Sequence, residues 1–208
     1  MLGPEVLTEL RGLSAANADR VARHLVAAGR LLDADPERAL LHARAARRTA
    51  GRLAAVREAV GVSAYLAGQR QEALTELRAV RRMSGDLTHL PLMADCERGL
   101  GRPARAVELA RSEEGRRLPP AERAELHIVE AGARRDLGEF DAALLVLQDA
   151  GLRPAQTQPW TLRIWYAYAD TLLAAGRGAE ARSWFESVLA ADEDGETDVE
   201  RRLDEIGS

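Results

Sequence analysis

The segment Gly68-Gln69-Arg70-Gln71-Glu72-Ala73-Leu74 is similar to four other segments of the chain of 208 residues. In each of them a helix end, usually a glycine, is followed by a short polar link and then by an alanine that starts the next helix. The four similar segments are residues 34–40, 101–107, 138–144 and 176–182. The anchoring alanines of all five segments are Ala39, Ala73, Ala106, Ala143 and Ala181, spaced by 34, 33, 37 and 38 residues. A period of this size is the signature of a repeat protein.

Each repeat has the features of a helical hairpin. Glycine ends a helix cheaply because it adopts the left-handed conformation, and Pro36 and Pro103 suit a first helical turn, where the missing N–H has no helical partner. Alanine and leucine, with 39 and 30 copies, are strong helix formers, and the small anchoring alanines let two helices approach closely. One hairpin cannot bury both of its faces, so neighbouring hairpins must stack. An all-α fold is predicted.

Two groups of residues show a resemblance to the tetratricopeptide repeat (TPR) family, whose period is about 34 residues. They are Gly61, Tyr65, Gly68, Ala73 and Leu77, and then Trp165, Tyr168, Ala169, Gly176, Ala181 and Phe185. The resemblance covers roughly residues 20–190, and the chain also resembles repeat proteins of high-GC, actinobacterial bacteria. The resemblance to the TPR family implies an α-solenoid of about five TPR-like hairpins, wound as a right-handed superhelix with terminal capping helices.

We expect a single domain over residues 1–208. The predicted repeats cover about 20–51, 54–85, 87–115, 121–151 and 160–191, with a C-terminal cap at about 197–206 and an N-terminal cap within 4–13. The first helices of the repeats are expected near 18–33, 52–67, 87–100, 121–137 and 160–175, and the second helices near 36–49, 70–83, 103–112, 140–150 and 178–190. Turn-forming residues at 113–120 and 151–159 account for the two longer spacings.

The residue types exclude several chemistries. All 29 basic residues are arginine, which removes P-loop, pyridoxal phosphate and protein kinase chemistry because each needs a lysine. Cys96 is the only cysteine, and the four histidines lack metal-ligand spacing. The acidic run 192–200 lacks the order of a calcium-binding loop. We therefore expect no catalytic residues, no metal and no cofactor, which indicates a non-enzymatic protein.

Charge and hydropathy give further expectations. No secretory signal and no run of ~18 apolar residues is present, so a cytoplasmic protein with no membrane contact is predicted. The net charge is −4, and a nucleic-acid binder is usually basic as a whole domain, which argues against nucleic acid. Residues 1–120 carry a net charge of +5 and residues 121–208 one of −9, so weak head-to-tail self-association is a further possibility.

The resemblance also indicates a binding surface. In TPR proteins the first helix of each repeat lines a concave groove, so we expect this groove to bind a peptide or protein partner. The residues carried over to it are His24, Glu58, Tyr65, Asp95, Arg98, Ile128, Arg135, Tyr166 and Asp170. A clamp for a C-terminal carboxylate is not expected, because His24, Ala28, Glu58 and Val62 replace its lysine and asparagine residues.

A second pattern involves arginine. One repeat apart, the segments 44–48 and 78–82 place Arg44, Arg47, Arg48, Arg78, Arg81 and Arg82 in two rows that could contact phosphate, nucleic acid or an acidic partner. The alternative is that arginine near a helix C-terminus is stabilised by the dipole, or that codon bias and repeat duplication placed it there. Both explanations stay open.

Aromatic residues cluster near the C-terminus, where six of the eight lie between residues 160 and 185. Trp165, Tyr168 and Phe185 occupy positions that the resemblance assigns to the core. Trp160 and Tyr166 are either exposed binding anchors or further core contacts.

Overall fold

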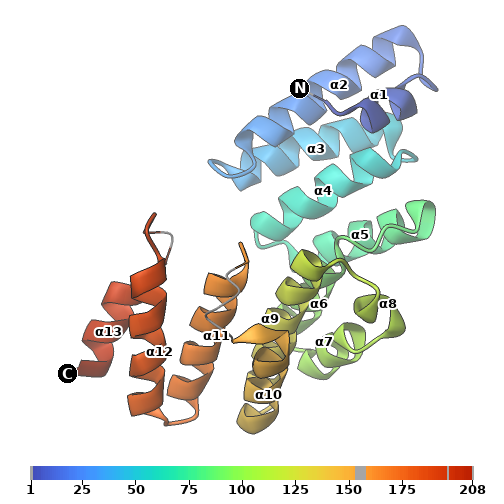
Figure 1. Ribbon diagram of the computed structural model, residues 1–208. Helices are drawn as coiled ribbons and strands as arrows, with labels where there is room; N and C mark the ends of the chain where they lie inside the picture. Colours follow the sequence, from blue (N-terminus) through green and yellow to red (C-terminus); the bar gives the residue numbers. More distant parts are fainter. Residues whose placement is uncertain (1, 153–157, 196, 208) are drawn as a thin grey trace. The chain divides into compact units, whose positions relative to one another are not determined.

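A computed structural model describes residues 2–152, 158–195 and 197–207 (Figure 1). Within these ranges the chain forms thirteen helices and no strand, as the predicted all-α class requires. Most of the predicted turn region 151–159 lies outside the described residues. The helices are α1 Pro4–Leu10, α2 Ala15–Leu31, α3 Pro36–Ala50, α4 Ala54–Leu66, α5 Arg70–Ser84, α6 Leu90–Gly99, α7 Pro103–Ala110, α8 Glu113–Arg116, α9 Pro120–Asp136, α10 Phe140–Gly151, α11 Thr161–Ala174, α12 Gly178–Ala191 and α13 Val199–Gly207.

The contacts of the chain divide it into two compact units, Met1–Leu100 and Gly101–Ser208. The first unit contains α1 to α6 and the second contains α7 to α13. Their boundary falls between α6 and α7, the two helices of the third predicted repeat. Each unit is described by itself below.

The first unit is built from the hairpins α2–α3 and α4–α5, with α3 also packed on α4 and α6 packed on α5. Its N-terminal core contains Leu10, Val21, Leu25 and Val56. Because Leu10 belongs to α1, this short helix covers the apolar end of the first hairpin, in agreement with the cap predicted within residues 4–13.

The second unit contains the hairpins α9–α10 and α11–α12, and α7 packs on α9. The four-residue helix α8 lies in the insertion predicted at 113–120. Helix α13 packs on α12 and places Val199, Leu203 and Ile206 against the core. Helix α13 thus lies in the segment where the cap is predicted, at about 197–206, and covers apolar side chains of this unit.

The anchoring residues lie where the repeat pattern predicts them. All five alanines, Ala39, Ala73, Ala106, Ala143 and Ala181, are 0% exposed. The glycines that end four of the first helices, Gly68, Gly101, Gly138 and Gly176, have φ between 72° and 78°. An L-residue with a side chain is strained in this conformation, which explains why glycine recurs at these turns.

Gly61 in α4 is expected to be intolerant of a side chain. A Cβ atom there would lie 2.6 Å from Cδ2 and 2.8 Å from Cγ of Leu77, and the Leu77 side chain is buried. Gly61→Ala should therefore lower the free energy of unfolding by about 1–2 kcal/mol through overpacking. Urea denaturation measures this change.

Gly29 in α2 provides the matched control. It is also helical, but a Cβ atom there would meet nothing within 4 Å. Gly29→Ala should raise the free energy of unfolding by about 0.5–1 kcal/mol, because alanine loses less backbone entropy than glycine in a helix. Equal changes in the two variants would contradict the close packing assigned to Gly61.

Candidate functional site

The first helices of the repeats carry the predicted groove residues, and in the first unit three of these residues contact one another. Tyr65 of α4 donates a hydrogen bond from its hydroxyl to Oδ2 of Asp95 on α6, at 2.9 Å. Arg98 donates from Nε to Oδ1 of the same carboxylate, also at 2.9 Å. Burial, and then the charge of Asp95, raise the pKa of the Tyr65 hydroxyl. The contacts join two successive first helices through polar side chains.

Glu58 lies about two helical turns before Tyr65 on α4 and contacts the residue that precedes α6. Its Oε1 atom is 3.0 Å from Nε2 of His89. The hydrogen bond with Glu58 raises the pKa of the His89 imidazole. His89 was not predicted at this site, although it follows Glu58 by 31 residues, about one repeat.

The second unit repeats this arrangement. Arg135 of α9 donates from Nη1 to Oδ2 of Asp170 on α11, at 2.5 Å, and Arg202 of α13 forms an ion pair with the other oxygen of Asp170. Tyr166 donates from its hydroxyl to Asp198, just before α13. Asp198 follows Tyr166 by 32 residues, and Arg202 follows Asp170 by the same interval, so α13 contacts α11 in the way that one first helix contacts the next. The interval of 32 residues, about one repeat, is the sequence signal that could have identified Asp198 and Arg202.

A depression of about 670 Å³ lies beside these contacts in the second unit. Ile128 and Tyr166, two of the predicted groove residues, line it together with Leu162 and Ala167. Arg163, Thr197 and Asp198 complete the lining. The Arg163 side chain is 63% exposed and forms an ion pair with Glu125 at 2.6 Å. The depression therefore combines an apolar floor with charged groups at its edge.

His24 has a different environment from the other predicted groove residues. Its Nδ1 atom is 3.0 Å from Nδ1 of His42 on α3, and Ala28, one turn further along α2, is buried. Burial lowers the pKa of His24, and the positive charges of His42, Arg48, Arg20 and Arg23 lower it further. His24 thus contacts the second helix of its own hairpin.

The register of α2 explains this difference. The link between α2 and α3 has four residues, 32–35, whereas the link between α4 and α5 has three, 67–69. The extra residue rotates the α2 face by one position relative to the anchoring alanine. A depression of about 510 Å³ accordingly follows Ala22, Arg23, Val26, Ala27, Arg30 and Leu31.

Three of the six row arginines are held in ion pairs with helices further along the chain. Arg44 donates from Nε to both carboxylate oxygens of Glu72, at 3.2 Å each, and this hydrogen bond lowers the pKa of Glu72. Arg47 contacts Glu72 at 3.1 Å and Glu76 at 2.5 Å. Arg78 forms an ion pair with Glu97.

The other three row arginines are arranged differently. Arg81 also takes part in a polar or electrostatic interaction. Arg48 and Arg82 are exposed and form no hydrogen bond or ion pair with the described residues. The structure thus divides the two rows into paired and exposed side chains.

The remaining candidates are the possible metal ligands, the cysteine and the C-terminal aromatic residues of the described part of the chain. No group of three or more histidine, cysteine, aspartate or glutamate side chains there could hold a metal ion. Cys96 is buried, and burial raises the pKa of its thiol to about 12. Trp165, Tyr168 and Phe185 are buried in the core, as expected, whereas Tyr166 is half-buried. None of the described helices combines the length and the apolar character needed to cross a membrane.

The stacked hairpins, the buried anchoring alanines and the left-handed glycines define an α-solenoid of the TPR type. A thermophilic TPR protein of Thermus thermophilus has a similar solved structure, with a TM-score of 0.69 and 18% sequence identity. The similarity covers 89% of this chain and 98% of that protein. No protein-family model and no curated protein matches the sequence.

Proposed function

We propose that this chain is a non-enzymatic protein-interaction module that binds a peptide or protein segment on the face formed by its first helices. The depression lined by Ile128, Leu162, Tyr166 and Ala167 is the observation that carries the proposal. Half-buried aromatic and aliphatic side chains around a hollow are the usual anchors of such contacts. The TPR-type fold supports the same class of function, although a fold alone does not fix it.

The chemistry of the depression selects the partner. Its apolar floor suits one large apolar side chain of the partner, because burial of such a side chain stabilises the complex by about 1.5–3 kcal/mol. Arg163 and Asp198 at the edge are exposed and suit polar groups beside that side chain. The module acts in the cytoplasm as a scaffold, and association of the basic residues 1–120 with the acidic residues 121–208 of a second copy is a further part of this proposal.

Selection of phage-displayed random peptides on the full chain tests the proposal. Ala167→Arg places a long charged side chain in the depression and should weaken the Kd of a selected peptide at least about tenfold, as loss of one anchor contact does. Fluorescence anisotropy with the labelled peptide measures the Kd.

Ala190→Arg is the matched control, because Ala190 is exposed on α12 and does not line the depression. We expect the control to bind the peptide as the parent chain does, with equal helix content in both variants by circular dichroism. Equal affinity of the two variants would place the binding site elsewhere.

A further inference from the structure

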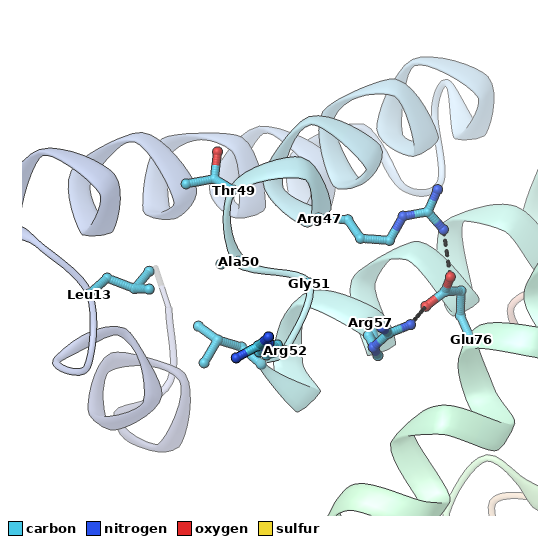
Figure 2. Close-up of a pocket in the computed structure, with 9 residues that line it drawn as sticks. Leu13, Arg47, Thr49, Ala50, Gly51, Arg52, Arg57 and Glu76 are labelled. Carbon is cyan, nitrogen blue, oxygen red and sulfur yellow. Dashed lines mark hydrogen bonds and ion pairs between the residues drawn. The ribbon is translucent and has the colours of Figure 1, made fainter.

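A second cavity, of about 600 Å³, lies in the first unit (Figure 2). It is formed where α3 ends and α4 begins, with α5 on the far side. Its charged lining consists of Arg47, Arg52, Arg57 and Glu76. Three arginines from α3, the link and α4 thus surround a single hollow.

Glu76 fixes two of these arginines. Its carboxylate is buried and accepts from Nη1 of Arg47 at 2.5 Å and from Nη1 of Arg57 at 2.8 Å. Figure 2 shows both guanidinium groups directed to this carboxylate from two sides. Charged side chains that are held by a buried partner lose less entropy when they bind a ligand.

The two fixed arginines keep unused hydrogen-bond donors. A guanidinium carries five N–H donors, and the only hydrogen bonds and ion pairs that the Arg47 and Arg57 side chains form with the described residues use Nη1. Their side chains are 32% and 30% exposed. The Nε and Nη2 groups of both arginines therefore remain available to a ligand.

Arg52 supplies a positive charge with no counter-charge. It is exposed, and it has no hydrogen bond or ion pair with any residue that the structure describes. Glu76 is the one carboxylate in the described lining, against three guanidinium groups, and Glu72, which lies outside the lining, is shared between Arg47 and Arg44. The Glu9 carboxylate accepts a hydrogen bond from the N–H of Ala55, in the first turn of α4, at 3.3 Å. Because this carboxylate already occupies the N-terminus of α4, the positive charge at the cavity comes from the arginines.

We propose that this cavity binds the phosphate group of a small phosphate monoester with an apolar body. Guanidinium groups recognise phosphate oxygens through paired, charge-assisted hydrogen bonds, and arginines from three segments suit a group with three terminal oxygens. Leu13, Ala50 and Leu53 provide an apolar wall for the rest of the molecule. This site uses Arg47 from the predicted rows, but its partners are Arg52 and Arg57 rather than the other row arginines.

Titration of the full chain with phenyl phosphate, followed by nuclear magnetic resonance, tests the site. Saturable shifts are expected for the backbone amides of residues 51–53 and for the Nε–H signals of Arg47, Arg52 and Arg57. Phenol, which has the same apolar body and no phosphate, should give no saturable shift. Equal binding of phenol and phenyl phosphate would overturn the proposal.

Two matched variants separate the site from general attraction of anions. Arg52→Gln should weaken the Kd for phenyl phosphate about tenfold, because it removes one charge-assisted contact. Arg48→Gln removes the same charge from another exposed arginine that does not line the cavity, and should change the Kd less than about twofold. Equal weakening by both variants, or shifts outside the cavity, would refute the assigned site.

Discussion

Phe185→Ala is expected to lower the stability of the second unit by about 3–5 kcal/mol, the usual cost of truncating a buried phenylalanine. The Phe185 side chain is 0% exposed. Its ring packs edge-to-face on Tyr166 at a centroid distance of 5.5 Å, and the guanidinium of Arg202 lies 5.8 Å from its centroid. The substitution therefore removes contacts with both α11 and α13.

Amide hydrogen exchange of α11 and α12 measures this effect, since each repeat is stabilised mainly by its neighbours. Leu189→Ala on the same helix is the control, because Leu189 is 41% exposed and should cost less than about 1 kcal/mol. Equal loss of protection in the two variants would contradict the role of Phe185 as a core residue of α12.

The helices could be predicted closely because their signals are local. Pro36 and Pro103 begin α3 and α7, and Gly138 and Gly176 follow the ends of α9 and α11. Each of these residues restricts the backbone at its own position, so the prediction needs no tertiary contact. The short helix α8 was missed because only one turn of chain forms it.

The position of His24 could not be predicted in the same way. Asp35 accepts a hydrogen bond from the N–H of Arg38 at 3.0 Å and caps α3, in the place that Gln69 holds before α5. The link after α2 is one residue longer because residues 32–34 precede this cap, whereas only residues 67 and 68 precede Gln69. One added residue turns a helix by about 100°. Placing the groove residues of the first repeat by their distance from Ala39 therefore selects the correct helix, α2. The face that it selects is displaced by one residue from the face equivalent to that of α4.

The arginine rows illustrate a second limit. Spacing of one repeat shows which arginines are equivalent, but it does not show which carboxylates face them. Glu72 and Glu76 of α5 face Arg44 and Arg47, and this contact depends on how α3, α4 and α5 pack. Arg57 joins the same carboxylate from α4, so the group that surrounds Glu76 emerges only in three dimensions.

Glu76→Ala is expected to lower the free energy of unfolding by about 2–3 kcal/mol, because removal of one partner of a buried ion pair leaves uncompensated charge. The carboxylate is buried and accepts from two guanidinium groups. Arg57 would lose its only partner among the described residues, whereas Arg47 would keep Glu72. The partial exposure of both arginines places the cost below that of a fully buried pair.

A double-mutant cycle with Arg57→Ala separates the interaction from the loss of packing. Urea denaturation of the four chains should give a coupling energy of about 1–2 kcal/mol, since the second substitution removes the charge that the first leaves unpaired. Glu113→Ala is the control, because Glu113 and Arg117 form an exposed pair that should contribute less than about 0.5 kcal/mol. If Glu76→Ala costs no more than this control, the buried carboxylate does not hold α3, α4 and α5 together, and stability there comes from apolar packing alone.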